Sequence, residues 1–301
     1  MVYVERTDYN KVISVKLMIP GTCNAKCTFC YMKDYKSSVL KNQKDEFLNN
    51  YLSSLNKIIS KIGDKNPISL DITGNEPTFD IKFLQKVLTQ LKEGNIKNKV
   101  QRVTMTTNGF HLKEIIPYLE GVVDYVNISV HDYRLDERRS IMGFKTFTDQ
   151  EYIEMIEGLR KIGITTSAVS VIHKYIPNFP KWFEEFTDWC NDLGFISLRI
   201  RCDVFWNQKE LFDFYMKYGL MQDDYTIIDH EETPDSHWCR LRRYDKFRVF
   251  FLKGVLDTSL LTKGIEYVVA DDGICYCDFY KRTKMEDCGY EIGKIYDLVM
   301  T

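Results

Sequence analysis

The sequence predicts an α/β protein built as a partial (β/α)6 TIM-like barrel, and three observations support this prediction. Apolar runs of strand length alternate with segments in which apolar residues recur at helical spacing. This alternation implies right-handed βαβ crossovers and a parallel sheet. About six or seven strand–helix units fit before residue 203, which is fewer than the eight of a closed barrel.

The individual elements follow in order along the chain. Apolar runs predict strands at residues 12–20, 68–73, 100–107, 125–131, 164–173 and 196–202. Helical spacing predicts helices at residues 48–62, 81–91 and 114–119. Thr148 and Glu151 form a capping-box pattern ahead of a further helix that ends near Gly163. Pro180 begins the last helix of the series.

Beyond residue 202 the strand–helix rhythm is lost. Aromatic and charged residues mix there, and four of the nine cysteines gather in this part. We therefore predict two regions, a barrel core over residues 1–202 and a C-terminal extension over residues 203–301 that packs on the barrel.

The composition is that of a globular protein without a dominant charge. The chain of 301 residues is 44% hydrophobic and 28% charged, with a net charge of -2. This balance gives no support for a nucleic-acid or membrane partner. The N-terminus lacks the apolar core of a signal peptide, and no apolar run reaches the ~18 residues of a membrane helix, so we expect a cytoplasmic protein. In a reducing compartment, clustered cysteines indicate metal binding or catalysis.

Three cysteines lie close together directly after the first predicted strand. Cys23, Cys27 and Cys30 fall within eight residues, at the carboxyl end of a strand, where barrel enzymes place their chemistry. Three thiolates can bind one iron–sulfur cluster, and a cubane then keeps one iron open to a small molecule. The alternatives are chance clustering and a zinc site, but zinc would need a fourth ligand that this loop does not show.

The spacing of these cysteines, with Phe29 before the last one, resembles the CxxxCxxC signature of the radical S-adenosylmethionine (radical SAM) superfamily. The resemblance implies that Cys23, Cys27 and Cys30 hold a 4Fe–4S cluster whose open iron binds S-adenosylmethionine (SAM). It also implies reductive cleavage of SAM to a 5′-deoxyadenosyl radical, which abstracts a substrate hydrogen. Phe29 and Tyr31 would lie beside the adenine, with ordinary loop packing as the alternative.

Two turns at predicted strand ends extend this resemblance. The first turn is similar to the family's GGEP element, which holds the methionine amino group, and consists of Gly74, Asn75, Glu76 and Pro77. Asn75 replaces the second glycine, and asparagine tolerates left-handed backbone. The second turn contains Thr107 and Asn108 and is similar to the family's TNG segment. Without the cysteines, both would be interpreted as plain turns.

The later strands add further candidates. The resemblance implies that Ser129 and Arg139 bind the ribose and carboxylate of the cofactor, with Arg134 and Arg138 as competitors for the role of Arg139. His173, at a strand end, is either a hydrogen-bond partner in the site or simply packed or solvated.

Two arginines share one face of the last predicted strand. Arg199 and Arg201 are two residues apart, and side chains alternate across a strand. If their face lines the barrel interior, they are candidates for an anionic substrate group. Otherwise they face the outer helices.

The C-terminal cysteines resemble the SPASM or twitch extensions of this superfamily. The resemblance implies an auxiliary cluster held by Cys239, Cys275, Cys277 and Cys288. Four thiolates suffice to close a second 4Fe–4S cluster. The spacing is one residue short if Cys277 is a ligand, and the full SPASM cysteine set is absent, so at most one such cluster is expected. Scattered reduced thiols are the alternative.

We predict a radical SAM enzyme that modifies a peptide, since proteins with this barrel and extension often do so. The alternatives are an enzyme for a small molecule or nucleotide, similar to the molybdenum-cofactor GTP cyclase, and a non-catalytic iron–sulfur redox sensor. The expected partners are a peptide or small-molecule substrate and an electron donor such as flavodoxin or ferredoxin. Neither nucleic acid nor a membrane is expected.

Overall fold

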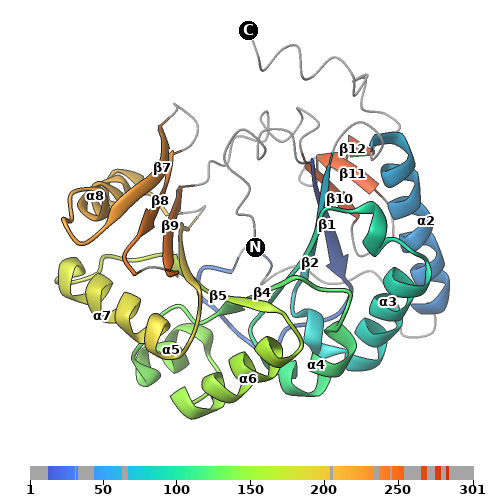
Figure 1. Ribbon diagram of the computed structural model, residues 1–301, viewed down its shortest axis with the longest axis horizontal. Helices are drawn as coiled ribbons and strands as arrows, with labels where there is room; N and C mark the ends of the chain where they lie inside the picture. Colours follow the sequence, from blue (N-terminus) through green and yellow to red (C-terminus); the bar gives the residue numbers. More distant parts are fainter. Residues whose placement is uncertain are drawn as a thin grey trace, which may run out of the picture. The chain divides into compact units, whose positions relative to one another are not determined.

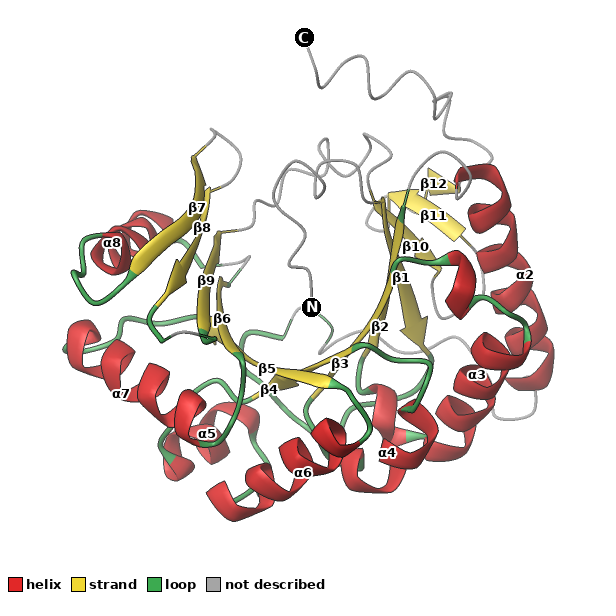
Figure 2. Cartoon of the chain, viewed as in Figure 1, coloured by secondary structure: helices red, strands yellow, loops and turns green. Residues whose placement is uncertain are grey.

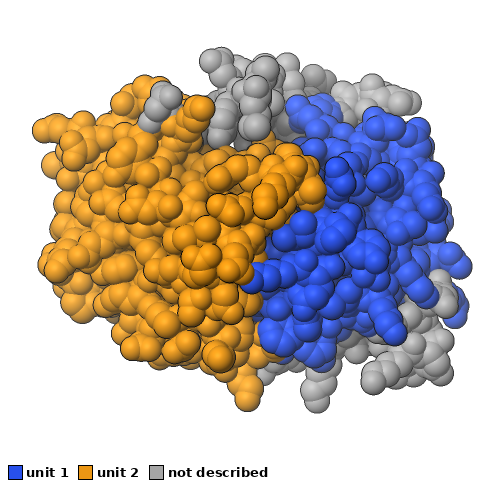
Figure 3. Space-filling model, turned by 60° about the horizontal axis from the view of Figure 1, so that its bottom comes forward, with its two compact units in different colours: residues 1–23, 35–124, 257–301 blue, residues 24–34, 125–256 orange. Residues whose placement is uncertain are grey.

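The computed structural model describes residues 13–30, 32, 44–62, 67–203, 206–232, 237–244, 246–253, 266–269, 275–278 and 283–284. The chain forms two compact units (Figure 3). Unit 1 comprises residues 1–23, 35–124 and 257–301, and unit 2 comprises residues 24–34 and 125–256. Both units combine strands with helices (Figure 1), which confirms the predicted α/β class.

Unit 1 has a sheet whose central strands are parallel. Its strands are β1 (Ile13–Ile19), β2 (Ile68–Gly74), β3 (Arg102–Thr107), β10 (Glu266–Val269), β11 (Cys275–Asp278) and β12 (Thr283–Lys284). Strand β1 lies between β10 and β2, and β3 follows β2, all in parallel. Strands β11 and β12 continue beside β10 in antiparallel order.

The helices of unit 1 cover one face of this sheet (Figure 2). They are α2 (Lys44–Ile62), α3 (Ile81–Glu93) and α4 (Leu112–Leu119), with short 3₁₀ turns η2 (Pro77–Phe79) and η3 (Lys97–Lys99). Asp80 is the N-cap of helix α3, and its carboxylate accepts the Phe83 N–H at 3.0 Å. Its apolar stripe, which includes Leu84 and Leu91, is fully buried.

Unit 2 has a parallel part that continues into an antiparallel part. Its strands are β4 (Tyr125–Ser129), β5 (Thr165–Ile172), β6 (Ser197–Cys202), β7 (Thr226–Glu232), β8 (His237–Arg242) and β9 (Arg248–Lys253). Strands β4, β5, β6 and β9 are parallel neighbours in that order. Strands β8 and β7 follow β9 in antiparallel order.

The helices of unit 2 lie on one side of its strands (Figure 2). They are α5 (Leu135–Met142), α6 (Asp149–Lys161), α7 (Phe179–Asp192) and α8 (Lys209–Leu220). The predicted capping box is present at the start of α6, where Thr148 and Glu151 each bond the other's backbone N–H. None of the helices in the described ranges is long and apolar enough to span a membrane.

All six strands predicted before residue 203 are present as β1 to β6. The rhythm after that point differs from the sequence expectation, because β9 pairs in parallel with β6 and β10 pairs in parallel with β1. An antiparallel hairpin, β7–β8, is inserted between α8 and β9 and hides the alternation in the sequence. The predicted division at residue 202 stays a prediction.

Candidate active site

In unit 1, the Gly74–Pro77 turn lies against the start of the cysteine loop. Gly74 has a φ of +128°, and a Cβ there would lie 2.7 Å from the Ile19 carbonyl oxygen, so only glycine fits this approach of β2 to β1. The Asn75 amide donates to the Gly21 carbonyl at 2.8 Å. The left-handed residue is therefore Gly74, and Asn75 contributes its side chain rather than its backbone tolerance.

Glu76 is buried, with only 4% of its surface exposed. Its Oε1 accepts from the Thr78 N–H at 2.9 Å, the Thr78 hydroxyl at 2.7 Å and the Thr107 hydroxyl at 2.5 Å. Its Oε2 accepts the Asn108 N–H at 2.6 Å. Burial raises the pKa of Glu76, and the hydrogen bonds from Thr107, Asn108 and Thr78 oppose this shift. The carboxylate joins the carboxyl ends of β2 and β3, and Oε2 retains capacity for one more donor.

Asn108 connects this network to the first cysteine. Its Oδ1 accepts the Phe110 N–H at 3.0 Å, and its Nδ2 donates to the Cys23 sulfur at 3.6 Å. Thr107 is fixed in turn, because its hydroxyl also accepts the Gly109 N–H at 2.9 Å. The structure thus brings the predicted residues Cys23, Glu76, Thr107 and Asn108 together in unit 1.

In unit 2, the other two cysteines lie in a tight turn. The Cys30 N–H donates to the Cys27 carbonyl at 3.1 Å, and the Lys26 N–H donates to the Met142 carbonyl at 2.8 Å. Gly143, at the C-terminus of α5, has a φ of +66°, and a Cβ there would lie 3.0 Å from the Lys26 Cβ. Helix α5 therefore positions the cysteine loop through a close approach that favours glycine.

Phe29, between these cysteines, packs against two histidines. Its ring centroid lies 4.9 Å from the ring of His131 and 4.9 Å from that of His173. From its place in the sequence, His173 is either a hydrogen-bond partner in the site or a packed or solvated side chain. The structure shows the His173 ring packed against Phe29. His131 was not a candidate in the sequence. These two ring contacts hold Phe29, the aromatic residue of the cysteine motif, within unit 2.

His131 adopts an uncommon backbone conformation, with a φ of +66°. Its side chain is buried, and its Nδ1 accepts the Val171 N–H at 3.3 Å while its carbonyl accepts the Ser170 hydroxyl at 2.8 Å. Burial lowers the pKa of His131 to about 3, with a smaller contribution from the charge of His173. The ring is therefore neutral at physiological pH.

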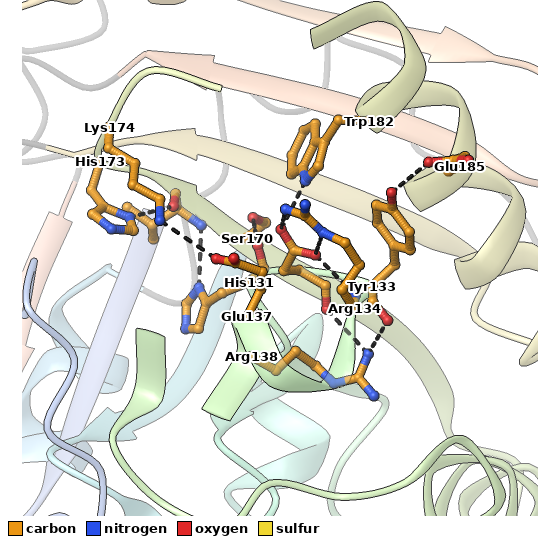
Figure 4. Close-up of polar contacts among 12 residues, drawn as sticks. His131, Tyr133, Arg134, Glu137, Arg138, Ser170, His173, Lys174, Trp182 and Glu185 are labelled. Carbon is orange, nitrogen blue, oxygen red and sulfur yellow. Dashed lines mark hydrogen bonds and ion pairs between the residues drawn. The ribbon is translucent and has the colours of Figure 1, made fainter. Parts of the chain in front are cut away.

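A pocket of about 320 Å³ opens beside His131 in unit 2, at the ends of β4 and β5. Asp132 accepts two hydrogen bonds from the Arg134 guanidinium, at 2.9 and 2.8 Å, one from the Arg134 backbone N–H at 2.9 Å and one from the Trp182 indole at 2.9 Å. Lys174 pairs with Glu137 at 3.5 Å (Figure 4). The charged side chains in the pocket wall thus have partners within it.

The three arginines that competed for one role have different environments. Arg138 is fully buried, pairs with Asp149 at 3.1 Å and lies 4.8 Å from the Trp189 ring centroid. It also donates to the Tyr133 carbonyl (Figure 4), so its role is structural. Arg134 is engaged by Asp132, as described above. Arg139 remains half-exposed, 4.0 Å from Asp136.

Arg199 and Arg201 lie on the face of β6 that is opposite the helices. Along β6 they alternate with the fully buried Leu198 and Ile200, which lie on the helix-covered face. The Arg199 guanidinium lies 4.9 Å from the Phe250 ring centroid on β9. Ser129 faces the same side as Arg199, because Ser129, Val169 and Arg199 are register partners across β4, β5 and β6. Two strand spacings separate Ser129 from Arg199, or roughly 10 Å.

The described cysteine side chains fall into two classes, half-exposed (Cys23, Cys27, Cys30) and buried (Cys190, Cys202, Cys239). Burial raises the pKa of Cys202 to about 11 and that of Cys239 to about 12, which disfavours the thiolates that bind iron. The loop cysteines therefore fit an iron–sulfur cluster.

The remaining cysteine and aromatic candidates are only partly described. Tyr31 and Cys288 lie outside the described residues. Cys275 and Cys277 lie on β11, but their side chains are not among those described. The auxiliary cluster stays a prediction.

Thiolates of cysteines are the ligands of iron–sulfur clusters, and barrel enzymes place their active sites at the carboxyl ends of parallel strands. The half-exposed cysteines after β1 combine these two features. Residues 17–190 match the family model described as the Radical SAM superfamily. The chain belongs to this family, and it is a radical SAM enzyme that uses a 4Fe–4S cluster and SAM.

Two of the similar curated proteins are named GTP 3′,8-cyclase. The GTP 3′,8-cyclase of Vibrio vulnificus is 29% identical over 185 residues, covering 58% of this chain and 52% of that protein. The GTP 3′,8-cyclase of Mannheimia succiniciproducens is 28% identical over 230 residues, covering 73% of this chain and 64% of that protein. The chain thus spans about half the length of the first of these relatives.

A solved structure similar over most of the chain is SuiB of Streptococcus suis bound to the precursor peptide SuiA. It has a TM-score of 0.59 and 14% identity, and the match covers 97% of this chain and 66% of SuiB. At this identity the match concerns the fold alone. It confirms the predicted fold class, an α/β partial barrel.

Proposed function

We propose that this enzyme holds its cluster on Cys23, Cys27 and Cys30 and acts on an anionic small molecule, with a nucleotide as the favoured class. This is the alternative of the sequence analysis rather than its main prediction of peptide modification. The similar curated proteins are named for a reaction of GTP. The likeness to SuiB concerns the fold and gives no support to a peptide substrate.

The observation that carries the proposal is the cationic face of unit 2. Arg199 and Arg201 lie on the strand face opposite the helices, where their charges can meet a ligand. Arg248 on β9 is the register partner of Ser197 and therefore shares this face. Guanidinium groups bind phosphate oxygens in bidentate geometry, so several of them on one face suit a polyphosphate.

The residues of unit 1 and unit 2 have separate tasks in this proposal. When bound, the reduced cluster supplies the electron that cleaves SAM into methionine and the 5′-deoxyadenosyl radical. Glu76 offers its Oε2 to the methionine ammonium, and Ser129 offers its hydroxyl to the ribose. Arg139 is the candidate for the methionine carboxylate, because Arg134 and Arg138 are engaged elsewhere. Phe29 presents an aromatic ring held by His131 and His173. An electron donor such as flavodoxin or ferredoxin completes the proposal.

The test measures 5′-deoxyadenosine from anaerobically reconstituted protein with dithionite and SAM, in the presence of GTP, of ATP or of peptides. We expect a nucleoside triphosphate to stimulate turnover and, when deuterated, to transfer deuterium to 5′-deoxyadenosine. The double variant Arg199→Ala, Arg201→Ala should raise the KM for the nucleotide at least about tenfold, since a charged hydrogen bond contributes ~1.5–3 kcal/mol. Lys161→Ala, which removes an exposed cation at the end of α6, is the matched control.

Three outcomes would contradict the proposal. Stimulation by peptides alone would restore peptide modification. A double variant with a raised KM for SAM and an unchanged KM for the nucleotide would assign the arginines to the cofactor. Cluster binding without any 5′-deoxyadenosine, under varied reductants, would favour a redox sensor.

A further inference from the structure

The side chain of Asn108 has a fixed orientation beside the first cysteine of the loop. Its Oδ1 accepts the Phe110 N–H at 3.0 Å. A backbone N–H can only donate, so the carbonyl oxygen of the amide must face Phe110 and the NH₂ group must face the other way. That NH₂ group lies 3.6 Å from the Cys23 sulfur.

The backbone of Asn108 is fixed as well. Its N–H donates to the buried Glu76 carboxylate at 2.6 Å, a short charge-assisted hydrogen bond. Only 6% of Asn108 is exposed, so water does not compete freely for its amide. The donor is therefore held toward the sulfur before any cluster chemistry takes place.

We propose that Asn108 sets the reduction potential of the 4Fe–4S cluster by donating an N–H···S hydrogen bond to Cys23. The inference rests on the proposed assignment of Cys23 as a cluster ligand. Reduction adds one negative charge to the cluster and its thiolates, so a donor to a ligand sulfur stabilises the reduced form more than the oxidised form. Asn108 is thus a positioning residue that makes the cluster easier to reduce by a one-electron donor.

The test compares Asn108→Ala and Asn108→Asp with the unmodified enzyme by redox titration of the cluster, followed by EPR of the reduced state. Asn108→Ala removes the donor and should lower the reduction potential. The expected change is up to about tenfold in the ratio of reduced to oxidised cluster at a given potential, or ~59 mV for a one-electron couple. Asn108→Asp keeps the acceptor for the Phe110 N–H and replaces the donor by a negative oxygen, so its shift should be larger.

Asn98→Asp is the matched control, since it makes the same chemical change at an exposed position in η3 and should leave the potential unchanged. Iron and sulfide content are measured for every variant. If the variants bind a full cluster with the potential of the unmodified enzyme, the role of Asn108 is refuted. If Cys23→Ala also keeps a full cluster that still cleaves SAM, the assignment of Cys23 itself fails. The two failures are therefore distinguishable.

Discussion

Replacement of His131 by asparagine should reduce the loss of stability that the protein shows at acidic pH. His131 is buried and neutral in the folded chain, and its pKa lies near 3 because burial disfavours the charged ring. In the unfolded chain the ring regains its ordinary pKa of about 6.5. As pH falls below about 6.5, the unfolded state takes up a proton that the folded state does not, so stability decreases with falling pH down to about 3.

The magnitude follows from these two values. At about pH 5.5, one pKa unit below the unfolded value, the loss relative to about pH 8 is ~1.4 kcal/mol. His131→Asn suits the site, because asparagine tolerates the φ of +66° and its Oδ1 can accept the Val171 N–H. The variant should therefore lose ~1.4 kcal/mol less than the unmodified protein between about pH 8 and about pH 5.5.

The assay is urea-induced unfolding of both proteins, under the same anaerobic conditions, at the two pH values. The difference between their pH dependences isolates His131, because His173 and all other titrating groups are present in both. Equal pH dependences would refute the reasoning, since they would mean that His131 is not held neutral by burial.

Two further substitutions test the packing that supports the site. Arg138→Ala should destabilise the fold by ~2–5 kcal/mol in chemical denaturation, because it removes a fully buried side chain that packs against the Trp189 ring and donates to the Tyr133 carbonyl; a loss below ~1 kcal/mol would contradict a structural role. Gly74→Ala should cost more stability than Gly163→Ala by roughly 1–3 kcal/mol, since both have positive φ but only Gly74 would bring a Cβ against the Ile19 carbonyl; equal losses would refute the close approach.

The sequence was sufficient for the six parallel strands before residue 203, but it did not reveal the later parallel strands β9 and β10 or the elements without apolar periodicity. Strands β1 to β6 carry apolar runs bounded by turns, so periodicity located them. Helix α5, Leu135–Met142, went unrecognised because half of its sequence LDERRSIM is charged and its buried apolar residues, Ile141 and Met142, both lie in its last turn. Strands β7 and β8 were missed because the sequence of β7 ends in the polar run DHEE and that of β8 contains two arginines, so neither shows an apolar run.

The candidate site divides in a similar way. The motif residues Cys23, Glu76, Thr107 and Asn108 were found from sequence because they belong to recognisable turns. The role of Arg138 was not, because its burial depends on Asp149 and Trp189, which contact it only in the folded chain. His131 had no signal either. A positive φ and a hydrogen bond from Val171, forty residues later, are properties of the fold alone.

The pairing of β1 with β10 has a consequence for synthesis. Ser14 pairs with Glu266, so one edge of β1 stays unpaired until a strand about 250 residues later in the chain has been synthesised. At ~5–20 residues per second, a ribosome needs ~12–50 s to reach that strand. During that interval β1, the strand that leads into the cysteine loop, offers a bare backbone edge to other nascent chains. Chaperone dependence and inclusion-body formation during rapid overexpression are the expected costs of joining the first and last parts of the sheet.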